Sequence, residues 1–152
     1  MTFVDSAMSN NSALYRQWVV VSDISKIEPL VAEVVALCLA KGVSARACRL
    51  NISVALTEAL SNAIICGNRS DAAKSVVATL SLNANSLTLE VTDEGNGFDL
   101  SDVMYSPDDE DWLDREDGRG LFLMRSLMDQ VELQEPSPNR AGHTVRMILK
   151  RS

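Results

Sequence analysis

The sequence is poor in residues that several common classes of protein require. It has one histidine, and its three cysteines, Cys38, Cys48 and Cys66, include no C-x-x-C pair, so neither a disulfide framework nor a zinc site is indicated. Acidic residues outnumber basic ones by 21 to 14, and no basic stripe with aromatic residues is present. The net charge of −7 argues against binding to the phosphate backbone of nucleic acids.

Signals for export and membrane insertion are also missing. The first dozen residues are rich in Ser and Asn and lack a basic start and an apolar run, so residues 1–13 are expected to form a flexible tail. The most apolar window, Leu30 to Ala40, contains Glu33 and is too short to cross a bilayer. We therefore expect a cytoplasmic protein with reduced, buried thiols and no contact with membranes.

The sequence does contain enough apolar residues for one core. With 152 residues, 46% of them hydrophobic, it predicts a single domain over residues 14–152. Apolar periodicity and turn residues predict three helices and five strands. The predicted helices are Ser25–Lys41, Ala45–Cys66 and Leu121–Met128, and the predicted strands are Gln17–Val21, Ser75–Leu82, Ser86–Thr92, Val131–Leu133 and Thr144–Lys150. Strands clustered beside a few helices indicate an α+β fold, a two-layer sandwich with the site between its layers.

The most informative segment begins where one of these strands ends. Residues 87–92 alternate apolar and polar side chains, so Asp93 emerges at the end of a half-buried strand, where its carboxylate can point into a cleft. Gly95 and Gly97 follow, and glycines at this spacing allow the backbone to approach a ligand closely. Taken alone, the segment is equally well explained as an ordinary tight turn.

A second pair of polar residues lies on the helix predicted for Ala45–Cys66. Glu58 and Asn62 are four residues apart, so their side chains share one face of that helix, among apolar neighbours. An amide oxygen on Asn62 suits a hard divalent cation such as Mg²⁺, and Glu58 suits a general base. Glu and Asn at this spacing are also a common solvated pair, which is the alternative explanation.

A third segment places glycines directly before an apolar helix. Gly118, Arg119 and Gly120 lead into Leu121, and the unpaired N–H groups of a helix start form an anion site. The spacing does not match a P-loop, and neither a P-loop nor a Rossmann fingerprint occurs in the sequence. The alternative is that these glycines only interrupt the chain before a helix.

In order, the motifs Glu58-x-x-x-Asn62, Asp93-x-Gly95-x-Gly97, Gly118-x-Gly120 and Gly142-His143-Thr144 resemble the N, G1, G2 and G3 boxes of the GHKL ATPase superfamily. Residues 55–63 and 118–125 are similar to anti-sigma serine kinases of bacterial partner switching, the RsbW and SpoIIAB group. The resemblance spans about Trp18 to Lys150 and implies the GHKL (Bergerat) fold, with a mixed, mostly antiparallel sheet covered by helices on one face.

The resemblance also implies a role for each motif residue. Asp93 would accept a hydrogen bond from the adenine amino group of ATP, Asn62 would bind Mg²⁺, and Glu58 would be the catalytic base. Gly95, Gly97, Gly118, Arg119, Gly120 and Leu121 would frame the phosphates and a mobile lid. Thr144 would lie by Asp93 near the base.

The implied function is an ATP- and Mg²⁺-dependent serine kinase that is also an anti-sigma factor. Its partners would be a sigma factor and a STAS-type antagonist, with a homodimer as a further expectation. Cys66 stands where this family usually has His. That departure favours an alternative, a nucleotide-gated module that sequesters a partner without phosphotransfer; a third hypothesis is an interaction protein with a relic site.

The segment 99–117 does not fit a phosphate-binding role. It carries nine acidic residues and the single basic residue Arg115, so it repels phosphates. It is either an outer lid that contacts a partner or a solvated surface loop.

Overall fold

The computed structural model describes residues 2–6, 13–95, 116–136 and 142–151. Six strands form one sheet in the order β1-β2-β3-β4-β6-β5, and every pairing in this part of the chain is antiparallel. The strands are β1 (Thr2–Ser6), β2 (Leu14–Val21), β3 (Ser75–Leu82), β4 (Ser86–Thr92), β5 (Gln130–Gln134) and β6 (Thr144–Lys150). The helical segments are η1 (Ile24–Lys26), α1 (Ile27–Ala40), η2 (Ala47–Ile52), α2 (Ser53–Ser61), η3 (Asn62–Gly67) and α4 (Glu116–Leu127).

The central hairpin follows directly from the alternation of its residues. Leu80 on β3 lies opposite Leu89 on β4, and both side chains are buried, while the intervening polar residues point to the other face. Asn83 closes the turn, because its side chain accepts hydrogen bonds from the N–H groups of Asn85 and Ser86 at 2.8 and 2.9 Å. The bounds predicted for these two strands and for β6 are confirmed.

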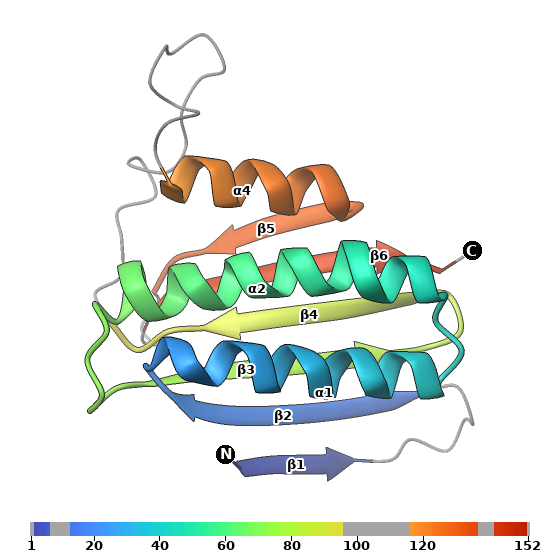
Figure 1. Ribbon diagram of the computed structural model, residues 1–152, viewed down its shortest axis with the longest axis horizontal. Coiled ribbons are helices and arrows are strands. Elements are labelled where there is room, and N and C mark those ends of the chain that lie inside the picture. Colours follow the sequence, from blue (N-terminus) through green and yellow to red (C-terminus); the bar gives the residue numbers. More distant parts are fainter. Residues whose placement is uncertain (1, 7–12, 96–115, 137–141, 152) are drawn as a thin grey trace, which may run out of the picture.

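The helices cover one face of the sheet, with α1 and α2 over the central strands and α4 beside them (Figure 1). Residues spaced four apart along the η2–α2–η3 helix are fully buried, which places one continuous apolar stripe against the sheet. This stripe consists of Ile52, Leu56, Leu60 and Ile64. The two-layer α+β sandwich with helices on one face is thereby confirmed.

Among the described residues, the η2–α2–η3 helix is the one helix that is long and apolar enough to cross a membrane. By length and composition alone, Ala47–Gly67 could cross a bilayer, and it is longer than the Leu30–Ala40 window that the sequence singles out. Its buried stripe packs on the sheet, as in the core helix of a globular domain.

The structure differs from the expectations in four local details. The sheet is antiparallel rather than mixed across the described pairings, and Thr2–Ser6 forms a strand paired with β2 where a flexible tail was expected. The helix expected over Ala45–Cys66 is continuous, but η2 and η3 within it are wider π-helical turns rather than α-helix. Helix α4 starts at Glu116, five residues before the expected Leu121, so Gly118 and Gly120 lie inside it.

The residue after β6 ties together three separate parts of the fold. The guanidinium of Arg151 donates hydrogen bonds to the carbonyls of Asn83, in the β3–β4 turn, and Lys41, after α1, at 2.7 and 2.9 Å. Its backbone N–H donates to the carbonyl of Asn85 at 2.8 Å. Strand β6 lies between β4 and β5, and the hydrogen bonds of Arg151 fix the position of its C-terminal end.

Candidate functional site

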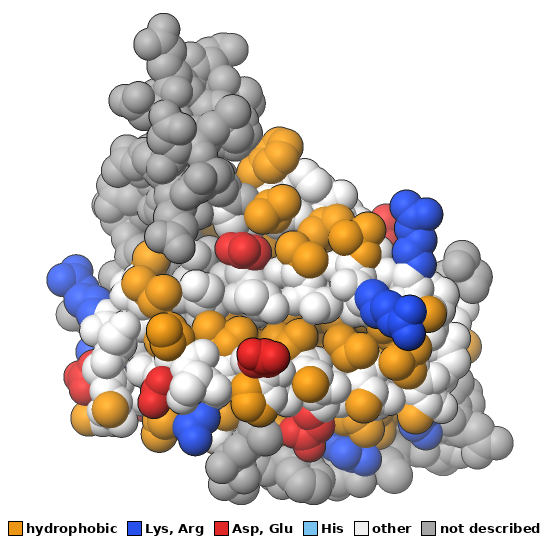
Figure 2. Space-filling view, viewed as in Figure 1, with side chains coloured by type: hydrophobic (Ala, Val, Ile, Leu, Met, Phe, Trp, Pro, Cys, Tyr) orange, Lys and Arg blue, Asp and Glu red, His pale blue; other side chains and the backbone are white. Residues whose placement is uncertain are grey.

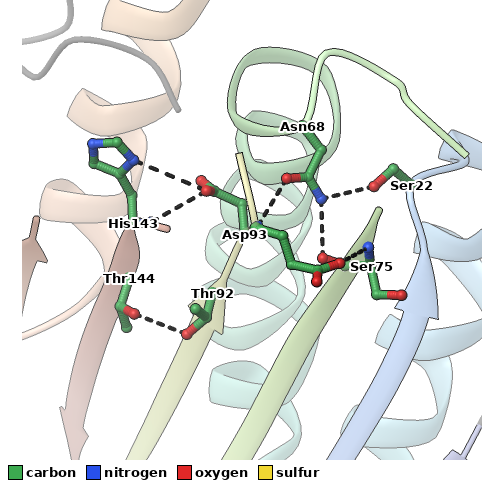
Figure 3. Close-up of polar contacts among 8 residues, drawn as sticks. Ser22, Asn68, Ser75, Thr92, Asp93, His143 and Thr144 are labelled. Carbon is green, nitrogen blue, oxygen red and sulfur yellow. Dashed lines mark hydrogen bonds and ion pairs between the residues drawn. The ribbon is translucent and has the colours of Figure 1, made fainter. Parts of the chain in front are cut away.

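Asp93 leaves the end of β4 and is almost completely buried, at 2% exposure. Its backbone N–H donates to the carbonyl of His143 at 3.0 Å, and the N–H of His143 donates to the Asp93 Oδ1 atom at 3.1 Å. The two residues are thus paired through backbone and side chain, just beyond the last β4–β6 register pair (Figure 3). A carboxylate is therefore fixed at the end of β4, a central strand, and its position after a strand is what the sequence predicts.

Burial dominates the electrostatics of this carboxylate. Desolvation raises the pKa of Asp93 above its ordinary value of 3.8, while backbone hydrogen bonds from His143 and Gly95 and the positive charge of Lys74 act in the opposite direction. The Nδ1 atom of His143 lies 3.9 Å from Asp93 Oδ1. The desolvation of the Asp93 carboxylate therefore outweighs the hydrogen bonds and positive charges that stabilise its ionised form.

Two glycines pack so closely around Asp93 that no side chain fits at either position. A Cβ on Gly67, the last residue of η3, would lie 2.2 Å from Asp93 Oδ2. A Cβ on Gly142 would lie 1.7 Å from the Asp93 carbonyl oxygen, and Gly142 has a φ of +82°, a conformation that favours glycine. Gly142 belongs to the predicted Gly142-His143-Thr144 motif, so this motif is placed against Asp93.

The predicted base and the predicted metal ligand meet the glycine-rich helix start. Glu58 in α2 and Asn62 at the start of η3 share one helix face, and α4 packs on α2. A Cβ on Gly120 would lie 2.9 Å from Glu58 Oε2 and 3.3 Å from Asn62 Nδ2. Asn62 is 8% exposed, so its amide sits in a largely water-excluded position. Three residues from two separate motifs therefore form one cluster.

The remaining predicted site residues are only partly placed. Thr144 is buried at the start of β6, and its hydroxyl is hydrogen-bonded at 2.8 Å to that of Thr92, its register partner. Gly95 is buried two residues after Asp93, and Leu121 is buried in α4. Gly118 and Arg119 belong to the first turn of α4. Only their backbone is described, so the Arg119 side chain is not placed.

Two expectations fall where the structure gives no description. Gly97 and residues 99–115 of the acidic segment lie outside the described residues. Of the segment 99–117, only the backbone of residues 116–117 is described, as the start of α4. Their roles stay predictions. Cys66 is partly exposed in η3, directly before Gly67.

The outer surface of the helices carries a separate apolar groove. Figure 2 shows hydrophobic side chains gathered along the boundary between α1 and the η2–α2 helix. The groove has a volume of about 480 Å³ and is lined by residues of both helices, including Val31, Val35 and Thr57. None of the predicted site residues lines it.

Sequence reasoning missed a buried polar cluster beside Asp93. Asn68 follows η3, is 0% exposed, and hydrogen-bonds to Ser22, Ser75 and Glu94 from three other segments (Figure 3). Glu94 also accepts a hydrogen bond from the N–H of Ser75. An Asn after a helix is an ordinary turn residue, so no local pattern marks Asn68. Gly67, the last residue of η3, requires glycine because of its packing against Asp93, and no local pattern marks this either.

Comparison with known proteins places this architecture in a family. Residues 20–149 match the model of the histidine kinase-like ATPase domain. The chain is similar to the serine-protein kinase RsbW of Bacillus licheniformis, at 34% identity over 104 residues that cover 64% of this chain and 61% of the relative. It is similar to the serine-protein kinase RsbW of Bacillus subtilis (strain 168), at 31% identity over 102 residues with the same coverage. The match thus spans about 61% of the length of these relatives.

Proposed function

We propose a function from the premise that this chain belongs to the histidine kinase-like ATPase domain family: it is an ATP- and Mg²⁺-dependent protein serine kinase that also acts as an anti-sigma factor. The observation that carries the proposal is the cluster in which Gly120 backs onto both Glu58 and Asn62. It brings a carboxylate, an amide and a glycine helix segment together. The similarity to serine-protein kinases supports the choice of reaction.

The residues present fit a nucleotide with its metal. Asp93 is a buried carboxylate whose Oδ1 accepts from the N–H of His143, and its remaining lone pairs can accept from a further donor, for which we propose the adenine amino group. The amide oxygen of Asn62 is a ligand type that Mg²⁺ accepts. Gly120, without a side chain, lets α4 pack directly against Glu58 and Asn62, where a Cβ would lie 2.9 Å from Glu58 Oε2.

Bound Mg²⁺ would neutralise charge on the phosphates, which is the chemistry that a metal supplies in phosphoryl transfer. The chain itself would contribute orientation and proton transfer. Glu58 would accept the proton of the incoming serine hydroxyl, in a position one helical turn before Asn62. The packing of α4 on α2 would exclude bulk water from this pair, because Asn62 is already 8% exposed.

The proposed partners are a sigma factor, bound in one state, and a STAS-type antagonist, phosphorylated on a serine in the other. We place these events in the cytoplasm, without direct contact with nucleic acid or membrane, and we propose a homodimer. A net charge of −7 supports the absence of nucleic-acid binding.

The test follows phosphoserine on a candidate STAS protein by mass spectrometry, with Mg²⁺ and ATP present. Glu58→Gln should slow transfer by roughly 10² to 10⁴ while nucleotide affinity stays near that of the wild type. Glu90→Gln is the matched control, because Glu90 faces away from the helices and lies 3.9 Å from Arg146. It should leave the rate unchanged.

A second candidate function has its own motivating residue. Cys66 occupies the position of the family's usual His, directly before Gly67 at the proposed site. If the wild type binds ATP and a sigma factor but transfers phosphate to no STAS protein, the chain is a nucleotide-gated sequestration module. If it binds no ATP, both functions are wrong.

A further inference from the structure

The side chain of Asn68 connects four parts of the chain at the buried end of the sheet. Its Nδ2 atom donates to the Ser22 hydroxyl, at the end of β2, at 2.8 Å and to the Ser75 carbonyl, at the start of β3, at 3.0 Å. Its Oδ1 atom accepts from the backbone N–H of Glu94, after β4, at 2.8 Å. Its own backbone N–H donates to the carbonyl of Ala63 at 2.8 Å. Asn68 itself is 0% exposed, and its side-chain contacts are drawn in Figure 3.

The chemistry of this position requires a carboxamide. The Ser22 hydroxyl uses its own proton on the Lys74 carbonyl at 2.8 Å, so it must accept from Asn68. The Ser75 partner is a carbonyl and the Glu94 partner is an N–H. Only a side chain with two donors and an acceptor satisfies all three, and a carboxylate of the same shape would lose both donors.

One of these hydrogen bonds acts on the peptide that follows Asp93. The Asn68 Oδ1 atom accepts a hydrogen bond from the N–H of Glu94, the residue after Asp93. The carbonyl of His143 accepts from the N–H of Asp93, and the N–H of His143 donates to Asp93 Oδ1. Gly67, the neighbour of Asn68, packs against the other carboxylate oxygen. The backbone of Asp93 is thus held from His143 on one side and from the end of η3 on the other.

We propose that Asn68 is a positioning residue that orients the Asp93 carboxylate and thereby sets the preference of the site for adenine over other bases. This inference rests on the proposed ATP site. Asn68 touches no nucleotide in this scheme and acts only through the peptide that follows Asp93 and through the neighbouring Gly67.

The test compares ATP with ITP, which carries a carbonyl oxygen where adenine has its amino group. Affinities for both nucleotides are measured by calorimetry on the wild type, Asn68→Ala and Ser22→Ala. In Asn68→Ala we expect ATP affinity to fall about tenfold and ITP affinity to change little, because the lost orientation affects the hydrogen bond that only ATP makes. The ratio of ATP to ITP affinity should therefore fall about tenfold.

Ser22→Ala is the matched control, because it removes a hydrogen bond from the same buried cluster but leaves the Oδ1 contact to Glu94 intact. It should lower the melting temperature without changing the ATP to ITP ratio. A second readout needs no nucleotide: exchange of the Glu94 amide proton, followed by NMR, should accelerate in Asn68→Ala and not in Ser22→Ala. Asn68→Ser serves for both measurements if Asn68→Ala yields no folded protein.

Equal losses of ATP and ITP affinity in Asn68→Ala, or an unchanged ratio with only a lower melting temperature, would show a purely structural role and overturn the proposal. A wild type that prefers ATP, with a variant that keeps this preference, overturns the role of Asn68 alone. A wild type that binds neither nucleotide overturns the proposed function together with this inference.

Discussion

Replacing Gly67 by Ala tests how tightly the end of η3 is packed against Asp93. The new Cβ would lie 2.2 Å from Asp93 Oδ2, 2.6 Å from Cγ and 2.9 Å from Cβ. The carboxylate cannot simply withdraw, because Asp93 is hydrogen-bonded to His143 through its N–H at 3.0 Å and through Oδ1 at 3.1 Å. The backbone of Gly67 does not have a positive φ, so the cost of the substitution is steric.

The magnitude follows from two opposing effects. Overpacking of this kind costs about 1–3 kcal/mol, and exchanging Gly for Ala in a helix returns up to about 1 kcal/mol. A net loss of about 1–2 kcal/mol corresponds to a melting temperature lowered by roughly 2–8 °C for a chain of this size. Displacement of the carboxylate should also weaken ATP binding about tenfold or more.

Thermal unfolding of Gly67→Ala, alone and combined with Asp93→Ala, separates steric conflict from a general helix effect. Asp93→Ala removes the two closest atoms and leaves only the Asp93 Cβ, at 2.9 Å, so Gly67→Ala should cost much less stability in that background. The coupling between the two substitutions should be about 1–3 kcal/mol. If Gly67→Ala lowers the melting temperature equally in both backgrounds, the close contact with the carboxylate is not what requires glycine here.

Three further predictions concern charge, metal and thiols. Burial raises the pKa of Asp93 above 3.8, so the folded state should lose stability as the pH rises from 3.8 through the raised pKa. Asp93→Asn should remove this loss of stability. Urea unfolding at several pH values tests this, and a variant less stable than the wild type at neutral pH would contradict it. The same variant should weaken ATP about 10- to 100-fold by calorimetry. Asn62→Ala should abolish the gain in ATP affinity that Mg²⁺ gives the wild type, and an unchanged gain would exclude Asn62 as the ligand. Burial raises the pKa of Cys38 to about 12 and also raises the pKa of Cys48. A thiol reagent at neutral pH should therefore modify Cys66 first, and Cys38 and Cys48 only on unfolding. Rapid modification of all three cysteines in the folded protein would contradict this prediction.

The sequence predicts best where local pattern and final environment agree. The bounds of β3, β4 and β6 follow from strict alternation, because each strand has one face on the core and one outside it. The face shared by Glu58 and Asn62 follows from helical spacing alone. These elements carry most of the candidate site.

What the sequence does not predict depends on partners distant in the chain. Thr2–Ser6 lacks a distinct strand pattern and is a strand because β2 offers it an edge. The early start of α4 includes Gly118 and Gly120, which intrinsic preference disfavours in a helix; packing of α4 on α2 compensates. Asn68 and Gly67 gain their importance only from Glu94 and Asp93, which lie 26 residues further along the chain.

The position of β6 in the sheet has a consequence for biosynthesis. Among the described strands, β5 pairs only with β6, although β6 follows it in sequence, and β4 likewise exposes one edge until β6 arrives. Domains form from the N-terminus onward during translation, so the β1-to-β4 half can assemble while these edges still lack a neighbour. His143, which fixes Asp93, immediately precedes β6. A ribosome-bound nascent chain would therefore remain unable to hold a nucleotide, and exposed to wrong strand pairing, until this last strand is inserted.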